Sequence, residues 1–225
     1  MDISVALATF NGAKYLDEQL FSLAQQELIP HELVAVDDGS TDNTARLLHQ
    51  FAQVAPFPVR IYQNESRLGY GMNFLRAADL CNGDAIVFCD QDDVWLPTKL
   101  RRVSDAMTNQ QADFVAHSAD VTDGDLTKTG QRYPEINMDG CWDSRQVREA
   151  FYPGFAIAVS RRFFANIRSL MAQPGFAIAA HDELICELAA TGWIRCELSE
   201  SLVHYRQHGA NLIGYHGWML KKRFA

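Results

Sequence analysis

The stretch DAIVFCDQDDVW, residues 84–95, places three aspartates directly behind a run of apolar residues. The run AIVFC (85–89) is continuously apolar, which predicts a strand that is buried on both faces of a sheet. Charge held at this density beside a core is costly unless something neutralises it. The stretch therefore predicts a buried sheet with a charged site at the end of one strand.

Composition narrows the class of protein. The chain has 225 residues, 48% of them apolar and 21% charged, which is typical of a globular protein with a sizeable core. Its net charge of −8 argues against general nucleic-acid binding, which needs a basic face. No apolar run reaches the roughly 20 residues of a membrane helix, and MDISVALATF has an acidic residue where a signal peptide is basic. We expect a cytoplasmic protein whose five cysteines (81, 89, 141, 186 and 196) are reduced and mostly buried.

Strand and helix patterns alternate along the first half of the chain. Strands are expected at 3–9, 32–38, 59–64 and 84–90, and helices at 13–26, 45–52 and 72–81, with Ser40, Thr41 and Asp42 all suited to the N-cap of the second. This alternation predicts an α/β fold with a mostly parallel central sheet and helices on both faces. Farther along, we expect helices at 97–110 (with Pro97 in the first turn), 161–172 and 182–193, and strands at 112–120 and 154–160. The polar, turn-rich segment 121–140 is expected to be a mobile loop.

Polar residues follow three of the expected strands, where ligands bind in parallel sheets. They are Thr9 and Asn11, then Asp37 and Asp38, then Asp90 to Asp93. Asp90 and Asp92 would point the same way in an extended segment and could face one Mg²⁺ or Mn²⁺, with Asp93 turned away to support the turn into Trp95. Each group alone could be ordinary turn or cap chemistry. Their coincidence favours a binding site.

Three further segments leave alternatives open. Asp37-Asp38 could bind a pyrimidine or ribose, or could simply form the turn DDGSTDNT. His181-Asp182-Glu183 opens a helix, so its acids are either caps or a general base. HYRQHG (204–209) suits a diphosphate or a metal, or a polar edge strand. Glycine-rich phosphate loops do not occur, because Phe74 stands where GYGMNF would need its third glycine.

Six segments, in order, carry a family likeness: SVALATFNG, ELVAVDDGSTDNT, NESRLGYGMN, FCDQDDVWLPTKL, HDELI and YRQHGANLIG. Together they resemble the family 2 glycosyltransferases, which have the GT-A fold, over about residues 2–214. DQDDVW with YRQHG is most similar to bacterial rhamnosyltransferases and related enzymes of surface-polysaccharide assembly. The resemblance implies one catalytic domain over 1–225, with 1–119 binding the nucleotide sugar and 120–225 on the acceptor side. Because relatives continue beyond YRQHG, it also implies an acceptor site that is incomplete here.

The resemblance assigns roles by position. Asp182 would be the catalytic base, where many members have Glu-Asp and this chain has His181-Asp182. Phe10 stands where tyrosine is frequent, which keeps a stacking ring without its hydroxyl. The donor would be bound by Thr9, Asn11, Asp37, Asp38, Arg67, Asn73, Asp90, Gln91 and Arg206. Mn²⁺ or Mg²⁺ would be held by Asp90, Asp92 and His208, with His204 as an alternative to His208.

The activity implied is inverting transfer from a nucleotide-diphosphate sugar, such as dTDP-rhamnose or a UDP-sugar, to a saccharide or lipid-linked saccharide acceptor. A sugar-phosphate nucleotidyltransferase is one alternative, although TFNGAKY lacks the glycine-rich basic loop expected there. A second alternative is a module that binds a nucleotide sugar without catalysis, but the presence of Asp182 argues against it. The tail YHGWMLKKRFA (215–225) predicts a frayed helix, or else peripheral contact with the anionic inner face of a membrane.

Overall fold

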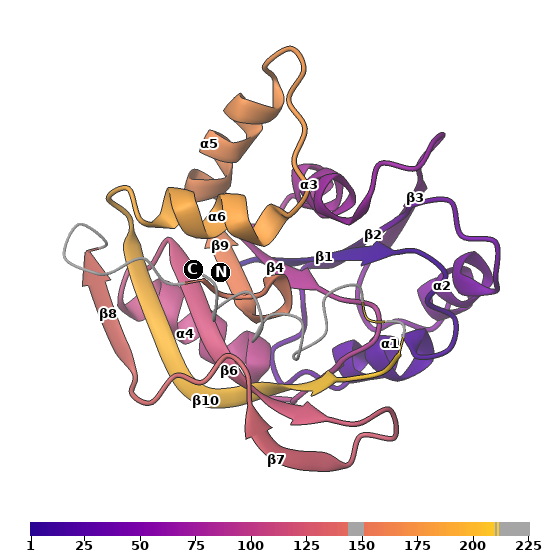
Figure 1. The fold of residues 1–225 in the computed structure, drawn as a ribbon, viewed down its shortest axis with the longest axis horizontal. Helices are drawn as coiled ribbons and strands as arrows, with labels where there is room; N and C mark the ends of the chain where they lie inside the picture. The colour runs from indigo at the N-terminus through magenta and orange to yellow at the C-terminus, as the bar shows by residue number, and fades with distance from the viewer. Residues whose placement is uncertain (144–150, 210, 212–225) are drawn as a thin grey trace.

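The computed structural model describes residues 1–143, 151–209 and 211. Its first half confirms the expected alternation, with β1 (Ile3–Thr9), α1 (Leu16–Ala24), β2 (Glu32–Asp37), α2 (Thr44–Ala52), β3 (Val59–Gln63), α3 (Tyr70–Leu80) and β4 (Ala85–Cys89). These four strands pair in parallel in the order β3-β2-β1-β4 (Figure 1). The chain order thus reverses beside β1, and the crevice at such a reversal is where ligands bind.

The second half completes the sheet with mixed pairing. Its elements are β5 (Val94–Trp95), α4 (Lys99–Asn109), β6 (Phe114–Thr122), β7 (Lys128–Arg132), β8 (Gly140–Asp143), the short 3₁₀ turn η2 (Gly154–Ala156), β9 (Ile157–Ser160), α5 (Arg161–Met171), α6 (His181–Ala189) and β10 (Ile194–Arg206). β9 lies antiparallel between β4 and β6, and β10 runs parallel to β6. The end of β10 therefore returns to the sheet edge at which β4 ends.

Apolar side chains cover both faces of the sheet, as the continuous strand runs require. All seven residues of β1 are buried, and successive residues point to opposite faces. Val5 and Leu7 join a core with α1, α2 and α4, whereas Ala6 and Ala8 join a second core with α3, α5 and α6 (Figure 1). Among the described residues, none of the helices has the length and apolarity needed to cross a membrane. The tail 215–225 lies outside the described residues.

The segment 121–140 differs from the expected mobile loop. β6 extends into it, and β7 and β8 arise within or at the end of it, because antiparallel backbone pairing does not require apolar side chains. Two helix starts also differ. Asn43 is the N-cap of α2, while the Asp42 carboxylate accepts the Thr44 N–H at 2.9 Å. Pro97 precedes the N-cap of α4, Thr98, and so lies outside that helix.

The expectation of five reduced thiols is wrong for two cysteines. Cys141 and Cys196 form a disulfide, because β8 and β10 pair antiparallel in a register that sets them directly opposite. Cys81, Cys89 and Cys186 are free and buried. Burial raises the pKa of Cys81 and of Cys186 to about 12, so these thiols are poor nucleophiles.

Candidate active site

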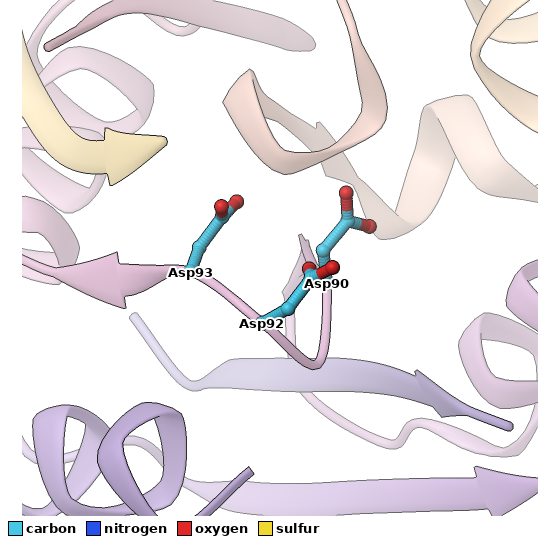
Figure 2. Close-up of side chains that lie close together, drawn as sticks. All are labelled: Asp90, Asp92 and Asp93. Atoms are coloured by element: carbon cyan, nitrogen blue, oxygen red, sulfur yellow. The ribbon is translucent and has the colours of Figure 1, made fainter. Parts of the chain in front are cut away.

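The loop between β4 and β5 carries Asp90, Asp92 and Asp93, which we call the acidic loop. One carboxylate oxygen from each of the three lies within 4.8 Å of the others (Figure 2). The expectation that Asp93 stands apart is wrong, since the loop bends and brings it to the other two. Asp93 is also structural: its Oδ1 accepts the Arg206 backbone N–H at 3.0 Å, whereas no hydrogen-bond partner of its Oδ2 is found among the described residues.

The acidic loop crowds three carboxylates together, with the buried Lys99 as a nearby cation. Burial, followed by the charges of Asp92 and Asp182, raises the pKa of Asp90 to about 8. Burial and the two neighbouring carboxylates raise the pKa of Asp93 well above its ordinary value. Crowded oxygen ligands, one of them buried without a hydrogen-bond partner among the described residues, fit a hard divalent cation such as Mg²⁺ or Mn²⁺.

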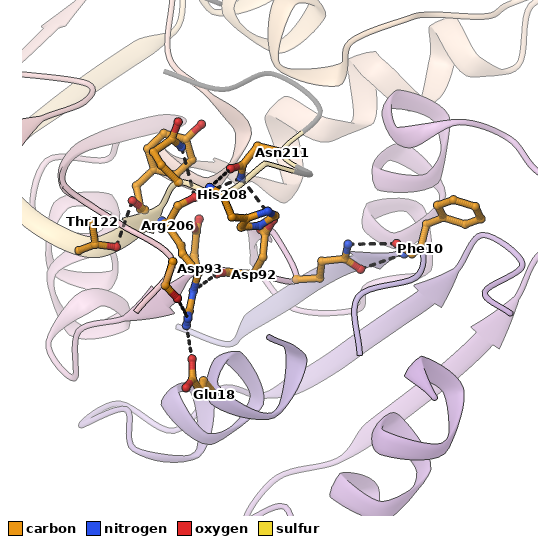
Figure 3. A network of polar contacts seen from close by, with 12 residues as sticks. Phe10, Glu18, Asp92, Asp93, Thr122, Arg206, His208 and Asn211 are labelled. Carbon is orange, nitrogen blue, oxygen red and sulfur yellow. Dashed lines mark hydrogen bonds and ion pairs between the residues drawn. The ribbon is translucent and has the colours of Figure 1, made fainter. Parts of the chain in front are cut away.

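The segment after β10 contributes two side chains to the acidic loop. His208 Nε2 lies 2.9 Å from Asp92 Oδ2, so the two predicted metal ligands are brought together (Figure 3). His204 instead lies within β10, paired with Val94 of β5. Asn211, which sequence analysis missed, accepts the His208 backbone N–H at 2.5 Å and donates to Asp92 Oδ2 at 3.5 Å. It lies inside the quoted motif YRQHGANLIG, but an asparagine three residues after a histidine has no distinctive spacing.

The loops after β1 and β2 are joined by polar side chains. Thr9 Oγ1 donates to Asp37 Oδ1 at 2.9 Å, and the Ser40 N–H donates to the other oxygen of Asp37 at 2.9 Å. Asn11 has a left-handed φ of 48°, and its side-chain oxygen accepts the Thr41 N–H at 2.8 Å. The structure thus gathers Thr9, Asn11 and Asp37 at one edge of the sheet, with Asp37 fixed from two sides.

Asp38 is held from behind by a short amide network. Its carboxylate accepts hydrogen bonds from Asn64 Nδ2 at 2.6 Å and from the Gly69 N–H at 2.9 Å. Asn73 is buried and accepts from the same Asn64 side chain at 2.9 Å. Asn73 therefore supports Asp38 through Asn64, a residue that sequence analysis did not single out.

Arg67 and Phe10 form a stacked pair beside Asp38. The Arg67 guanidinium carbon lies 3.8 Å from the centre of the Phe10 ring, and its Nε lies 4.0 Å from Asp38 Oδ2. The Arg67 side chain is 64% exposed, so it remains accessible to a ligand. A planar cation on an aromatic ring is suited to stacking with a flat ligand group.

Gln91 joins the loop after β1 to the acidic loop. Its Oε1 accepts the Phe10 N–H at 2.9 Å, and its Nε2 donates to the Phe10 carbonyl at 3.1 Å (Figure 3). A β-carbon on Gly12 would lie 2.1 Å from Gln91 Oε1, so a larger residue at position 12 would displace the Gln91 side chain. The side-chain amide of Gln91 thus bonds the backbone of Phe10.

Asp182 lies in the first turn of α6, near enough to the acidic loop for its charge to act on Asp90. Its Oδ1 accepts the Glu183 N–H at 3.0 Å, and the backbone N–H of Gly154 also donates to the carboxylate. Burial raises the pKa of Asp182 to about 6, and Asp182 in turn contributes to the raised pKa of Asp90. A buried carboxylate with a pKa near neutrality is suited to general base catalysis.

His181 is a core aromatic residue. Its ring stacks on Phe74, with centroids 4.1 Å apart, and is tilted against Phe88 at 5.2 Å. Neither ring nitrogen has a hydrogen-bond partner among the described residues. Burial lowers the pKa of His181 to about 3, so the ring is neutral and packs as an aromatic.

The sequence model of the family described as glycosyl transferase family 2 matches residues 4–168 of this chain. This chain belongs to glycosyl transferase family 2. It is 34% identical to the dTDP-rhamnosyl transferase RfbG of Shigella flexneri, over 92% of this chain and 73% of that protein. It is 31% identical to an uncharacterized glycosyltransferase of Nostoc sp., over 94% of this chain and 66% of that protein.

Solved structures share the fold of this family 2 member. S. aureus TarS 1–349 in complex with UDP-GlcNAc has a TM-score of 0.78 at 20% identity, covering 94% of this chain and 60% of that one. The mannosyltransferase PcManGT of Pyrobaculum calidifontis, in complex with GDP-Man and Mn²⁺, has a TM-score of 0.67 at 19% identity, covering 98% and 60%. The expected GT-A fold is confirmed, and the chain spans about 60% of these solved chains.

We expect Gly154→Ala to destabilise this glycosyltransferase by about 1–3 kcal/mol, the usual cost of overpacking. An added β-carbon would lie 2.3 Å from His181 Nε2, inside a packed core. Urea unfolding of Gly154→Ala, His181→Ala and the double variant measures the coupling. The loss from Gly154→Ala should largely disappear in the His181→Ala background. Additive losses would show that the contact with His181 is not the cause.

Proposed function

We propose that this chain transfers a sugar from a nucleotide-diphosphate sugar to a hydroxyl of a saccharide or lipid-linked saccharide, with inversion at the anomeric carbon. The observation that carries the proposal is that Asp182, buried in the first turn of α6 with a pKa raised to about 6, acts electrostatically on Asp90 of the acidic loop, at the sheet's ligand-binding edge. The likeness to a dTDP-rhamnosyl transferase over 92% of the chain supports a dTDP-sugar, such as dTDP-rhamnose, ahead of a UDP-sugar. The resemblance of DQDDVW with YRQHG to rhamnosyltransferases adds a role in surface-polysaccharide assembly to this proposal.

In the proposed reaction, a carboxylate oxygen of Asp182 takes the proton from the acceptor hydroxyl. The acceptor oxygen then forms a bond to the anomeric carbon, while the bond from that carbon to the diphosphate breaks. In this proposal the acceptor hydroxyl approaches from the side of Asp182, opposite the diphosphate. Mn²⁺ or Mg²⁺, held by Asp90, Asp92 and His208, would supply positive charge for the departing diphosphate.

On the donor side, the base and ribose would lie over the joined loops after β1 and β2. Asp38 is fixed by Asn64 and Gly69, and Thr9 and Asp37 hold each other, so the acceptors for ribose hydroxyls are in place before binding. Arg67 on Phe10 offers a flat cationic surface for the base. Residues 1–119 would then form the donor half of one catalytic domain, and 120–225 the acceptor half.

One experiment tests the proposed function. dTDP-rhamnose and UDP- and GDP-sugars are each incubated with the protein and a saccharide acceptor, with and without Mn²⁺, and the products are identified. Release of nucleoside diphosphate that depends on Mn²⁺ supports transfer. Release of pyrophosphate would identify a nucleotidyltransferase, and tight donor binding with no turnover would identify a binding module.

The pH dependence of turnover should follow Asp182. Because only the ionised carboxylate accepts a proton, kcat/KM is expected to be flat above about pH 7 and to fall below about pH 6. With a pKa of about 6, kcat/KM at pH 5 should be roughly tenfold below the plateau. The measurement is made at saturating Mn²⁺, because the acidic loop also titrates. A profile that rises toward low pH would contradict the assignment of Asp182 as the base.

A further inference from the structure

Arg206, the last residue of β10, uses its whole side chain inside the protein. Its Nε donates to the Asp92 carbonyl oxygen at 2.8 Å, one terminal nitrogen donates to the Gly124 carbonyl at 2.8 Å, and the other pairs with the Glu18 carboxylate of α1 (Figure 3). Its backbone N–H donates to Asp93 Oδ1 at 3.0 Å. The side chain is only 3% exposed. One residue therefore ties the acidic loop, the loop after β6 and helix α1 together.

Tyr15 continues this junction to the candidate metal ligand His208. The Arg206 guanidinium carbon lies 4.5 Å from the centre of the Tyr15 ring. The His208 ring stacks on the same tyrosine, with centroids 4.5 Å apart and an interplanar angle of 29°. His208 then reaches Asp92 at 2.9 Å. Arg206 and Tyr15 thus act on the same aspartate. Arg206 holds the backbone of Asp92, and Tyr15 orients the His208 ring, which contacts the Asp92 carboxylate.

We propose that Arg206 is a positioning residue, which holds Asp92 and the Tyr15–His208 stack so that Asp92 and His208 converge on one divalent cation. This rests on the proposed function, and it differs from direct binding of the donor diphosphate, which the family resemblance implies for this residue. The Arg206 guanidinium borders the cavity beside His208, but it is buried and all three of its nitrogens are bonded to protein oxygens, so it presents little to a ligand. The planar guanidinium makes those three bonds at the same time, and a lysine ammonium does not reproduce this arrangement.

The charge of Arg206 gives the test a clear sign. Arg206 is a cation beside the candidate cation site, so by electrostatics alone its removal should tighten Mn²⁺ binding. Loss of positioning should weaken Mn²⁺ binding, because the ligands no longer converge. If Arg206 instead contacts the donor diphosphate directly, its loss should leave the affinity for Mn²⁺, measured without nucleotide, unchanged or higher. It should also weaken the binding of dTDP measured without metal.

The probe is Mn²⁺ alone, without nucleotide, titrated by electron paramagnetic resonance of the free ion. Arg206→Gln and Arg206→Lys are each expected to weaken Mn²⁺ binding by about 10- to 100-fold, the usual effect of losing a group that orients metal ligands. Arg206→Lys keeps the positive charge but loses the planar guanidinium. If Arg206→Lys and Arg206→Gln weaken Mn²⁺ binding equally, the geometry of the side chain is responsible and its charge is not. Glu18→Gln should weaken binding in the same direction and by less. Asp17→Asn, an exposed acid next to Glu18, is the matched control and should have no effect.

A double-mutant cycle tests whether Arg206 acts through His208. In a His208→Ala background, Arg206→Gln should weaken Mn²⁺ binding by clearly less than it does in the unaltered protein, because the part of its effect that acts through His208 is already lost. If thermal unfolding shows that Arg206→Gln does not fold, Tyr15→Leu, which changes no charge, carries the same test. Unchanged or tighter Mn²⁺ binding in the folded variants, or additivity in the cycle, would overturn the inference. Absence of Mn²⁺ binding by the unaltered protein would instead overturn the metal site of the proposed function.

Discussion

Asp182→Asn is expected to lower the rate of sugar transfer by about 10²- to 10⁴-fold, the contribution typical of a general base. Asparagine has nearly the same shape, and its oxygen can still accept the Glu183 N–H, so the start of α6 should be kept. Its amide cannot take the proton from an acceptor hydroxyl. Transfer is measured as release of nucleoside diphosphate, and the donor Kd, measured by calorimetry, should not change.

The same variant should be more stable than the unaltered protein at pH 7. Burial raises the pKa of Asp182 from 3.8 to about 6, so the free energy of unfolding falls as the pH rises from about 3.8 to about 6, and the whole loss is present above pH 6. Replacing it with a neutral amide should add on the order of 1–3 kcal/mol to the free energy of unfolding at pH 7, and nothing near pH 3. Glu183→Gln, at the exposed neighbouring position, is the matched control and should keep transfer within about twofold. Unchanged turnover of Asp182→Asn would remove this residue from the mechanism.

Asp92→Asn should abolish most metal binding, and transfer with it. Asp92 contributes a charge to the crowded acidic loop and is the partner of His208, so its loss removes both the attraction for a cation and one ligand. Loss of a group that only supports a metal ligand lowers metal affinity by about 10- to 100-fold. Loss of a direct ligand such as Asp92 should therefore lower it by at least about 100-fold. Mn²⁺ binding is measured by electron paramagnetic resonance, and turnover is measured as a function of Mn²⁺ concentration.

Asp125→Asn is the control for Asp92→Asn. Asp125 is an exposed acid that lines a cavity of about 530 Å³ together with His208, but it is not among the three carboxylates that converge. Its loss should leave the Mn²⁺ affinity within about threefold, since an exposed charge is largely screened. Full activity of the unaltered protein in a strong chelator, or normal Mn²⁺ affinity of Asp92→Asn, would contradict the proposed metal dependence.

The sequence by itself predicted the α/β sheet and the edge at which the site lies. The apolar runs of β1, β2 and β4 are local signals, and their polar ends at Thr9, Asp37 and Asp90 follow from chain order alone. Because parallel strands place their carboxyl ends at one edge, these distant residues could be grouped without coordinates. Asp182 needed the family resemblance, since an acid at a helix start is more often a cap.

Tertiary structure alone decided the contacts made over long separations. Arg206 meets Glu18 across 188 positions, and His208 meets Asp92 across 116. The bend that brings Asp93 to the acidic loop, and the register that joins Cys141 to Cys196, depend on where β10 lies. Periodicity records which face of an element is apolar, but it holds no information on which remote polar group that element will meet. That pairing is set only when the packed sheet fixes the ends of β4 and β10 beside helix α1.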